Sequence, residues 1–119
     1  MSDVYLNRSA NLANTNLTTL YTVPTADVTT TPPQKPVQAI VNAIRVTNDS
    51  GGAVVIDVVI TDASVGADIK IAYQKSIASN SYEELLSRPI VLENSDVLKV
   101  QAGGGNALHV VASILEITP

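Results

Sequence analysis

The sequence predicts an all-β protein, a single-domain β-sandwich or jelly roll of about eight short antiparallel strands with an extended N-terminal arm. The chain has 119 residues, which is the length of one domain. Apolar residues make up 45% of the sequence and aromatic residues only 3%, so β-branched and other aliphatic side chains must build the core, and these suit a pleated sheet. Short apolar alternations recur between turns, and no segment has a convincing helical period.

Residues 1–16 are polar and rich in Asn, and they show neither a strand period nor a helix period. They are therefore predicted to form an extended arm outside the core, with a reach of about 50 Å. Such an arm could lie on a neighbouring subunit, with Val4, Tyr5 and Leu6 as its apolar anchor. A frayed terminus that contacts nothing fits the composition equally well.

Residues 17–119 are expected to form the sandwich domain, in which residues 25–36 make a Pro/Thr-rich loop. The prolines of this loop disfavour helix and support a semi-rigid extended segment, while a ligand for an aromatic-lined groove is the alternative. Strands are expected over residues 17–23, 38–48, 53–61, 69–77, 82–86, 90–92, 97–102 and 107–118.

The clearest predicted element is a β-hairpin of residues 38–48 and 53–61, joined by the glycine-containing turn 48–52. Alternation gives each strand one common face, with Ile40, Asn42, Ile44 and Val46 in the first strand and Val54, Ile56, Val58 and Ile60 in the second. Val55 and Val59 lie on the opposite face of the second strand. That face is therefore expected to be half covered, by the arm, a loop or a partner subunit.

The sequence predicts no catalytic site and no cofactor. With one histidine, His109, and no cysteine, the chain cannot form a Cys/His nucleophile pair or a His-rich zinc site. His109 is expected to be a packing residue of the last strand, with a pH-sensitive contact at a subunit boundary as the alternative. Glu83 and Glu84 are adjacent in a predicted strand, so they point to opposite faces and cannot act as a paired acid and base.

Two further groups of residues have the chemistry of ion sites. The glycines 103–105 could form an anion nest, but they join two β segments and are expected to make a hairpin turn. Asp57, Asp62 and Asp68, with Asp49, could converge and bind calcium. Their spacing matches no calcium-loop motif, so no metal site is predicted.

The net charge of the chain limits the classes of partner that it can bind. The formal net charge is −4 and 15% of residues are charged, which argues against nucleic acid and against an anionic membrane surface. The first residues lack the pattern of a signal peptide, and no apolar run approaches the roughly 18 residues of a membrane span. Synthesis in a cytoplasm is therefore expected.

Four segments in a fixed order resemble small virion structural proteins of tailed bacteriophages, of the capsid decoration or cement type. They are NLTTLYTVP (16–24), IRVTNDSGGAVVIDVVITD (44–62), YEELLSRPIVLENSDVLKVQA (82–102) and NALHVVASILEIT (106–118). The chain departs from the pattern where residues 25–36 replace a short Gly-containing turn, and where residues 94–96 replace a glycine-aspartate turn. The resemblance implies a β-sandwich or jelly-roll virion subunit without a catalytic motif.

From this resemblance we expect a non-enzymatic cement protein on the outer capsid surface, made in the host cytoplasm, that clamps neighbouring major capsid subunits. Its partners would be the major capsid protein or other virion subunits, and it would be a homo-oligomer, with a trimer favoured. A small neck, tail or fibre component is the first alternative. A host-surface carbohydrate-binding module is the second, which would have to stack sugars on Tyr5, Tyr21, Tyr73 or Tyr82 because the chain has no Trp and no Phe.

Overall fold

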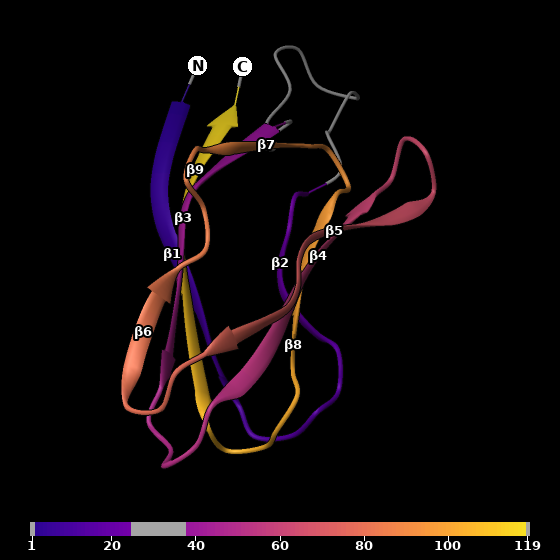
Figure 1. Ribbon diagram of the computed structural model, residues 1–119. Helices are drawn as coiled ribbons and strands as arrows, with labels where there is room; N and C mark the ends of the chain where they lie inside the picture. The colour runs from indigo at the N-terminus through magenta and orange to yellow at the C-terminus, as the bar shows by residue number, and fades with distance from the viewer. Residues whose placement is uncertain (1, 25–37, 119) are drawn as a thin grey trace.

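The computed structural model describes residues 2–24 and 38–118, and this part of the chain contains nine strands and no helix. The strands are β1 (Ser2–Leu12), β2 (Thr18–Thr22), β3 (Gln38–Asn48), β4 (Val54–Asp62), β5 (Ala67–Ile77), β6 (Ser81–Glu84), β7 (Ile90–Glu93), β8 (Val97–Ala102) and β9 (Leu108–Thr118). They form two antiparallel sheets that pack on each other (Figure 1), so the predicted all-β sandwich is confirmed. The predicted Pro/Thr-rich loop lies outside the described residues. Within the described ranges, no helix is long and apolar enough to cross a membrane.

The chain passes repeatedly from one sheet to the other. Sheet A has the strand order β1-β9-β3-β6, and β7 also pairs with β3, while sheet B has the order β2-β8-β4-β5. Among the described strands, β4 and β5 are the only consecutive strands that pair with each other. This connectivity buries the inner face of each sheet against strands that are distant in sequence.

The predicted hairpin of residues 38–48 and 53–61 is wrong, because β3 lies in sheet A and β4 in sheet B. The connection between them is a corner held by the buried side chain of Asn48. Its amide nitrogen donates to the carbonyl oxygens of Gly52 and Ile77, each at 2.9 Å, and its Oδ1 accepts from the backbone N–H of Ser50. A glycine-containing turn therefore marks a change of sheet here.

The predicted hairpin turn at residues 103–105 is also a corner, since it joins β8 of sheet B to β9 of sheet A. The backbone N–H of Gly103 donates to the carbonyl of Val55 at 2.9 Å. A Cβ atom on Gly105 would lie 2.9 Å from the carbonyl oxygen of Ala13, which leads from β1 to β2. These glycines allow the close approach of two neighbouring segments.

The core lies between the sheets and is almost entirely aliphatic. The inner face of β4 is the predicted one, whereas the inner face of β3 changes along the strand. Ala39 and Val41 are buried in its first half, and Ile44 and Val46 in its second. A register shift between residues 41 and 43, a β-bulge against β9, causes the change. Ile40 therefore lies on the outer face of sheet A, which corrects its predicted position.

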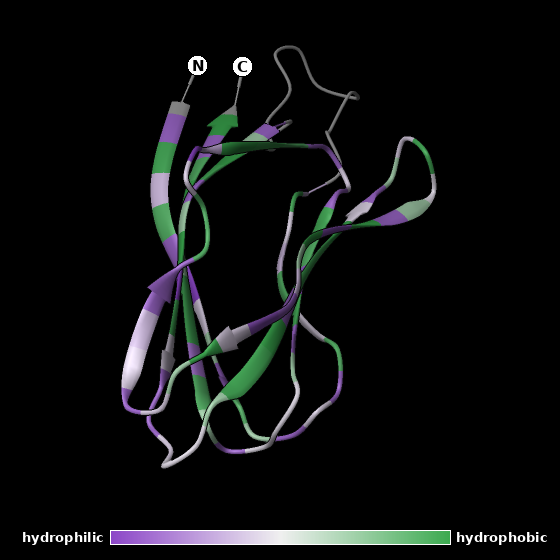
Figure 2. Cartoon of the chain, in the orientation of Figure 1, coloured by the Kyte–Doolittle hydropathy of each residue, from purple (hydrophilic) through white to green (hydrophobic). Residues whose placement is uncertain are grey.

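Residues 2–12 are extended, as predicted, but they belong to the sandwich. β1 pairs with β9 in an unbroken register from Ser2 opposite Thr118 to Leu12 opposite Leu108. Leu12 is 3% exposed, and Leu6 packs against the core. This corrects the prediction of an arm outside the core. Hydrophilic and hydrophobic residues alternate along β1 (Figure 2), but Arg8, in the same inward-facing set as Leu6 and Ala10, interrupts the apolar period in the sequence.

Candidate interaction surface

A row of apolar side chains crosses four strands on the outer face of sheet A. Tyr5 of β1 lies directly opposite Leu115 of β9. Leu115 in turn lies opposite Ile40 of β3, and Ile40 lies opposite Val91 of β7. Directly opposed residues point to the same face, so these four side chains lie side by side. Tyr5 is 78% exposed and Val91 58%, while Leu115 and Ile40 are half-buried. We call these four residues the outer apolar row.

Polar residues flank the outer apolar row on both sides. One neighbouring register line holds Asp3, Gln38 and Glu93 together with the half-buried Ile117. The line on the other side includes Asn7 and Ser113. A contiguous apolar strip with a polar rim is typical of a surface that contacts another macromolecule.

The three predicted anchor residues of the N-terminal segment do not share one face. Tyr5 points outward in the outer apolar row, whereas Val4 and Leu6 belong to the inward-facing set of β1. Leu6 is partly buried against the core, and Val4 is 51% exposed. Of the three, Tyr5 is therefore the residue that is most available to a partner.

The outer face of β4 is largely covered by its own chain. Val59 is 7% exposed, and its cross-strand neighbours Lys99 and Lys70 have alkyl stems that can cover it. Val55 is half-buried beside Gly103, where an added Cβ would lie 2.5 Å from its side chain. Sequence reasoning identified this face as half covered, but it missed the outer apolar row because the bulge in β3 cannot be read from alternation.

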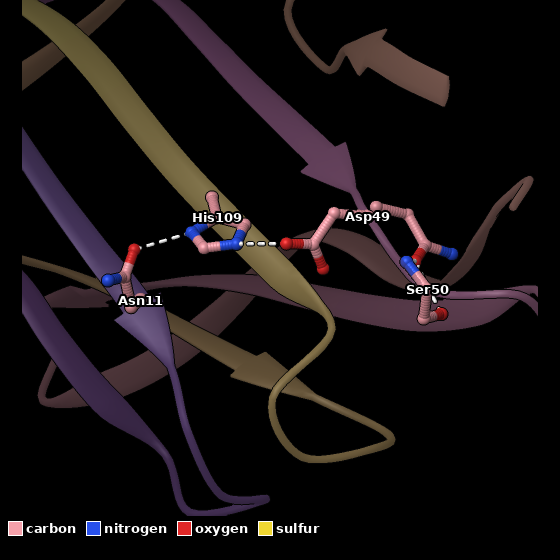
Figure 3. Close-up of polar contacts among 5 residues, drawn as sticks. Asn11, Asp49, Ser50 and His109 are labelled. Atoms are coloured by element: carbon pink, nitrogen blue, oxygen red, sulfur yellow. Dashed lines mark hydrogen bonds and ion pairs between the residues drawn. The ribbon is translucent and has the colours of Figure 1, made fainter. Parts of the chain in front are cut away.

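His109 lies on the outer face of β9 between two polar partners (Figure 3). Its Nδ1 is 2.5 Å from Oδ1 of Asn11 on β1, and its Nε2 is 2.9 Å from Oδ2 of Asp49 in the β3–β4 corner. The side chain is 45% exposed, so the prediction of a packing residue is wrong. The nearby hydroxyl of Ser50 donates its hydrogen bond to Oδ1 of Asn48 at 2.7 Å and not to the imidazole of His109. This group fastens β1 and the corner to β9, and we call it the His109 clasp.

The aspartates considered for calcium do not converge. Asp57 accepts a hydrogen bond from the backbone N–H of Gln74, Asp68 accepts one from the hydroxyl of Thr61, and Asp49 belongs to the His109 clasp. Each has a separate local partner. These carboxylates therefore stabilise the strands and turns around them.

A different set of carboxylates, Asp62, Glu93 and Asp96, does come together, with one oxygen of each within 4.8 Å of the others. Asp96 is buried and accepts from the backbone N–H groups of Ala63 and Glu93, each at 2.9 Å. Asp62 accepts from the hydroxyl and the N–H of Ser64, which lower the pKa of Asp62. Hydrogen bonds within and between the turns at residues 62–66 and 93–96 therefore explain why these three carboxylates lie together.

Tyr21 of β2 connects the two sheets at the end of β1. Its hydroxyl donates to Oε2 of Glu116 on β9 at 2.5 Å, and the guanidinium of Arg8 lies 5.8 Å from its ring centre. Burial, followed by the hydrogen bond and the charge of Glu116, raises the pKa of Tyr21 far above its ordinary value. Tyr21 is 4% exposed and therefore offers no surface to a sugar.

A groove of about 530 Å³ runs between β5 and β6, where the sandwich opens at its side. Polar residues, among them Lys75, Glu83 and Glu84, line most of it, together with the apolar side chains of Ile71 and Leu85. Glu84 is paired with Arg45 across the outer face of sheet A. The exposed rings of Tyr73 and Tyr82 have the cations of Lys70 and Arg45 over them, at 4.1 and 4.6 Å.

Comparisons with known proteins bear on the fold. No protein-family model and no curated protein matches the chain. Among solved structures, it is similar to a chain of the acidic stable capsid structure of Helicobacter pylori bacteriophage KHP30, with a TM-score of 0.57, 9% identity, and coverage of 98% of this chain and 92% of that one. A chain of the T13 particle of IBDV gives a TM-score of 0.57 at 10% identity, over 98% of this chain but 31% of that one. At these identities the likeness shows a shared fold.

Proposed function

We propose that this chain is a non-enzymatic structural protein of a tailed-phage virion that works by packing against other virion subunits. The observation that carries the proposal is the outer apolar row, a contact strip built on a sandwich whose core needs no partner. The occurrence of the same fold in a phage capsid structure supports it. The resemblance of the segments between residues 16 and 118 to phage virion proteins points the same way.

Within that role, a capsid decoration protein on the outer surface of the head explains the features best. The outer apolar row would lie on neighbouring major capsid subunits and clamp them, and a homotrimer suits sites where capsid subunits meet in threes. The row is narrow, so each contact would be weak. Repetition over a lattice converts weak contacts into lasting attachment through multivalency. A neck, tail or fibre subunit could use the same strip on another surface.

The test uses particles from a phage in which the gene for this chain has been deleted. Purified chain is added to them, and bound protein is measured after sedimentation and located by electron microscopy. We expect saturable binding to heads by the native chain and loss of at least about tenfold in affinity for Val91→Lys, which places a charge in the outer apolar row.

The matched control is Val65→Lys, because Val65 is similarly exposed at the tip of the β4–β5 hairpin, away from sheet A. This variant should bind like the native chain. Binding confined to the neck or tail would select the alternative location. Absence of the chain from native particles, together with no binding to deleted ones, would refute a virion role.

A further inference from the structure

The exposed edges of the two sheets differ in how well they could accept another strand. β2 is short and has a register shift against β8, and β6 and β7 have four residues each. β5 is long, but it has two register shifts against β4, a positive φ of 50° at Gln74, and two lysines, Lys70 and Lys75. Short length, bulges and lysines are the features that prevent edge-to-edge pairing of sheets.

β1 has none of these three features, and its one inward-facing charge, Arg8, lies over the ring of Tyr21. It has eleven residues, contains neither Lys nor Pro, and keeps one unbroken register with β9. β1 ends the strand order of sheet A, and no strand of the described ranges pairs with its other side. A long, regular edge of this kind is a template for a further strand.

We propose that β1 pairs with β1 of a second copy of this chain, antiparallel about a twofold axis perpendicular to the sheet, with Tyr5 opposite Tyr5. In this register Val4 faces Leu6 of the second copy, Asp3 faces Asn7, and Arg8 faces Ser2. No two like charges are opposed, and apolar residues meet apolar ones. A shift to the next symmetric register, centred on Leu6, would instead set Tyr5 against Asn7 and Val4 against Arg8.

The outer apolar row supports the same register. With Tyr5 opposite Tyr5, the row continues without interruption across the twofold axis, from Val91 of one copy to Val91 of the other. On the inner side, Leu6 of the second copy covers Val4, which is 51% exposed in the single chain. Both faces of the edge thus gain apolar contacts in addition to the new backbone hydrogen bonds.

This inference concerns the chain alone and goes beyond the proposed virion role. A twofold contact through β1 makes the number of chains in solution even. It gives a dimer when it acts alone, and a hexamer when it joins two trimers. The purified protein therefore tests it without any phage particle, and failure of one proposal leaves the other standing.

The first test is a disulfide, because the chain has no cysteine of its own. Directly opposed Cα atoms are about 4.5–5.5 Å apart, within disulfide range, so Tyr5→Cys should give covalent dimers under mild oxidation. The control Ser9→Cys lies on the same face, but its sulfur would be roughly 27 Å from its copy in this register. Dimers of both variants at equal rates, or of neither, would overturn the proposal.

The second test is the solution mass by light scattering over a range of concentrations. Tyr5→Lys places two like charges opposite each other at the twofold axis and should halve the mass. Tyr73→Lys makes the same substitution at an exposed position of β5 and should leave the mass unchanged. A native chain that is monomeric or trimeric at every concentration would refute the twofold contact.

Discussion

β1 and β5 are both edge strands of eleven residues, one in each sheet, yet they relate to the sandwich in opposite ways. β1 has a polar sequence and is paired along its whole length, with Leu12 in the core. β5 has an alternating apolar sequence, but its first four residues are all exposed. The β4–β5 hairpin projects from the sandwich (Figure 1). Position relative to the opposing sheet, more than hydropathy, decides which strand stabilises the fold.

Removal of each strand region in turn should give the largest difference in stability between β1 and β5. Deletion of residues 1–12 uncovers β9 and removes Leu12 from the core, so it should lower the free energy of unfolding by more than about 3 kcal/mol. Replacement of residues 64–67 by a two-residue turn keeps Ala63, whose backbone N–H donates to Asp96, and Asp68; it removes only exposed side chains and should cost less than about 1 kcal/mol. Urea unfolding followed by circular dichroism measures both. An unchanged midpoint for the deletion would show that β1 acts as a separate arm.

Single substitutions in β1 and β5 should differ in the same direction. Leu12→Ala should cost about 2–5 kcal/mol, because Leu12 is 3% exposed and its truncation leaves a cavity. Ile69→Ala on β5 removes an apolar side chain that is 48% exposed and should cost less than about 0.5 kcal/mol. The two variants are compared by urea unfolding. Equal losses would mean that the projecting hairpin packs on the sandwich in solution.

Much of the fold could be predicted from the sequence, because strands and turns have local signatures. The segment 97–102 was predicted with the observed bounds of β8, and the inner face of β4 followed from its alternation. Sheet membership could not be predicted, since a glycine-containing connection can close a hairpin or turn a corner between sheets. The corner at Asn48 depends on hydrogen bonds to Gly52 and to the distant Ile77.

The candidate surface was predicted only in part. Tyr5 was predicted, with Val4 and Leu6, to anchor a polar segment on a neighbour, and this contact stays a prediction. Its companions Ile40, Leu115 and Val91 come from three other strands, and the cross-strand register alone aligns them. The bulge in β3 that turns Ile40 outward is set by pairing with β9, so no local pattern reveals it.

Tyr21 tests how strongly β9 of sheet A is linked to β2 of sheet B. Tyr21→Phe removes the hydrogen bond to Glu116 and should cost about 1–2 kcal/mol at neutral pH. Burial and Glu116 raise the pKa of Tyr21, so this stabilisation is complete below the ordinary pKa of about 10 and is lost as the pH rises above it. Thermal unfolding from pH 8 to 11 should show a steeper loss for the native chain than for Tyr21→Phe. Parallel curves would contradict the buried phenol.

The smallest loss of stability is expected from removing the His109 clasp. This variant tests whether side-chain contacts or backbone pairing hold β1 in place. His109→Ala removes the contacts with Asn11 and Asp49, but the His109 and Asp49 side chains are 45% and 58% exposed, so it should cost less than about 1 kcal/mol. Glu84→Ala, which breaks the similarly exposed ion pair with Arg45 on the same sheet, is the matched control and should cost about as much. Urea unfolding compares the variants, and amide hydrogen exchange reports on β1. If His109→Ala alone cost more than about 2 kcal/mol and released the amides of β1, side-chain contacts rather than the continuous backbone ladder would hold this edge strand.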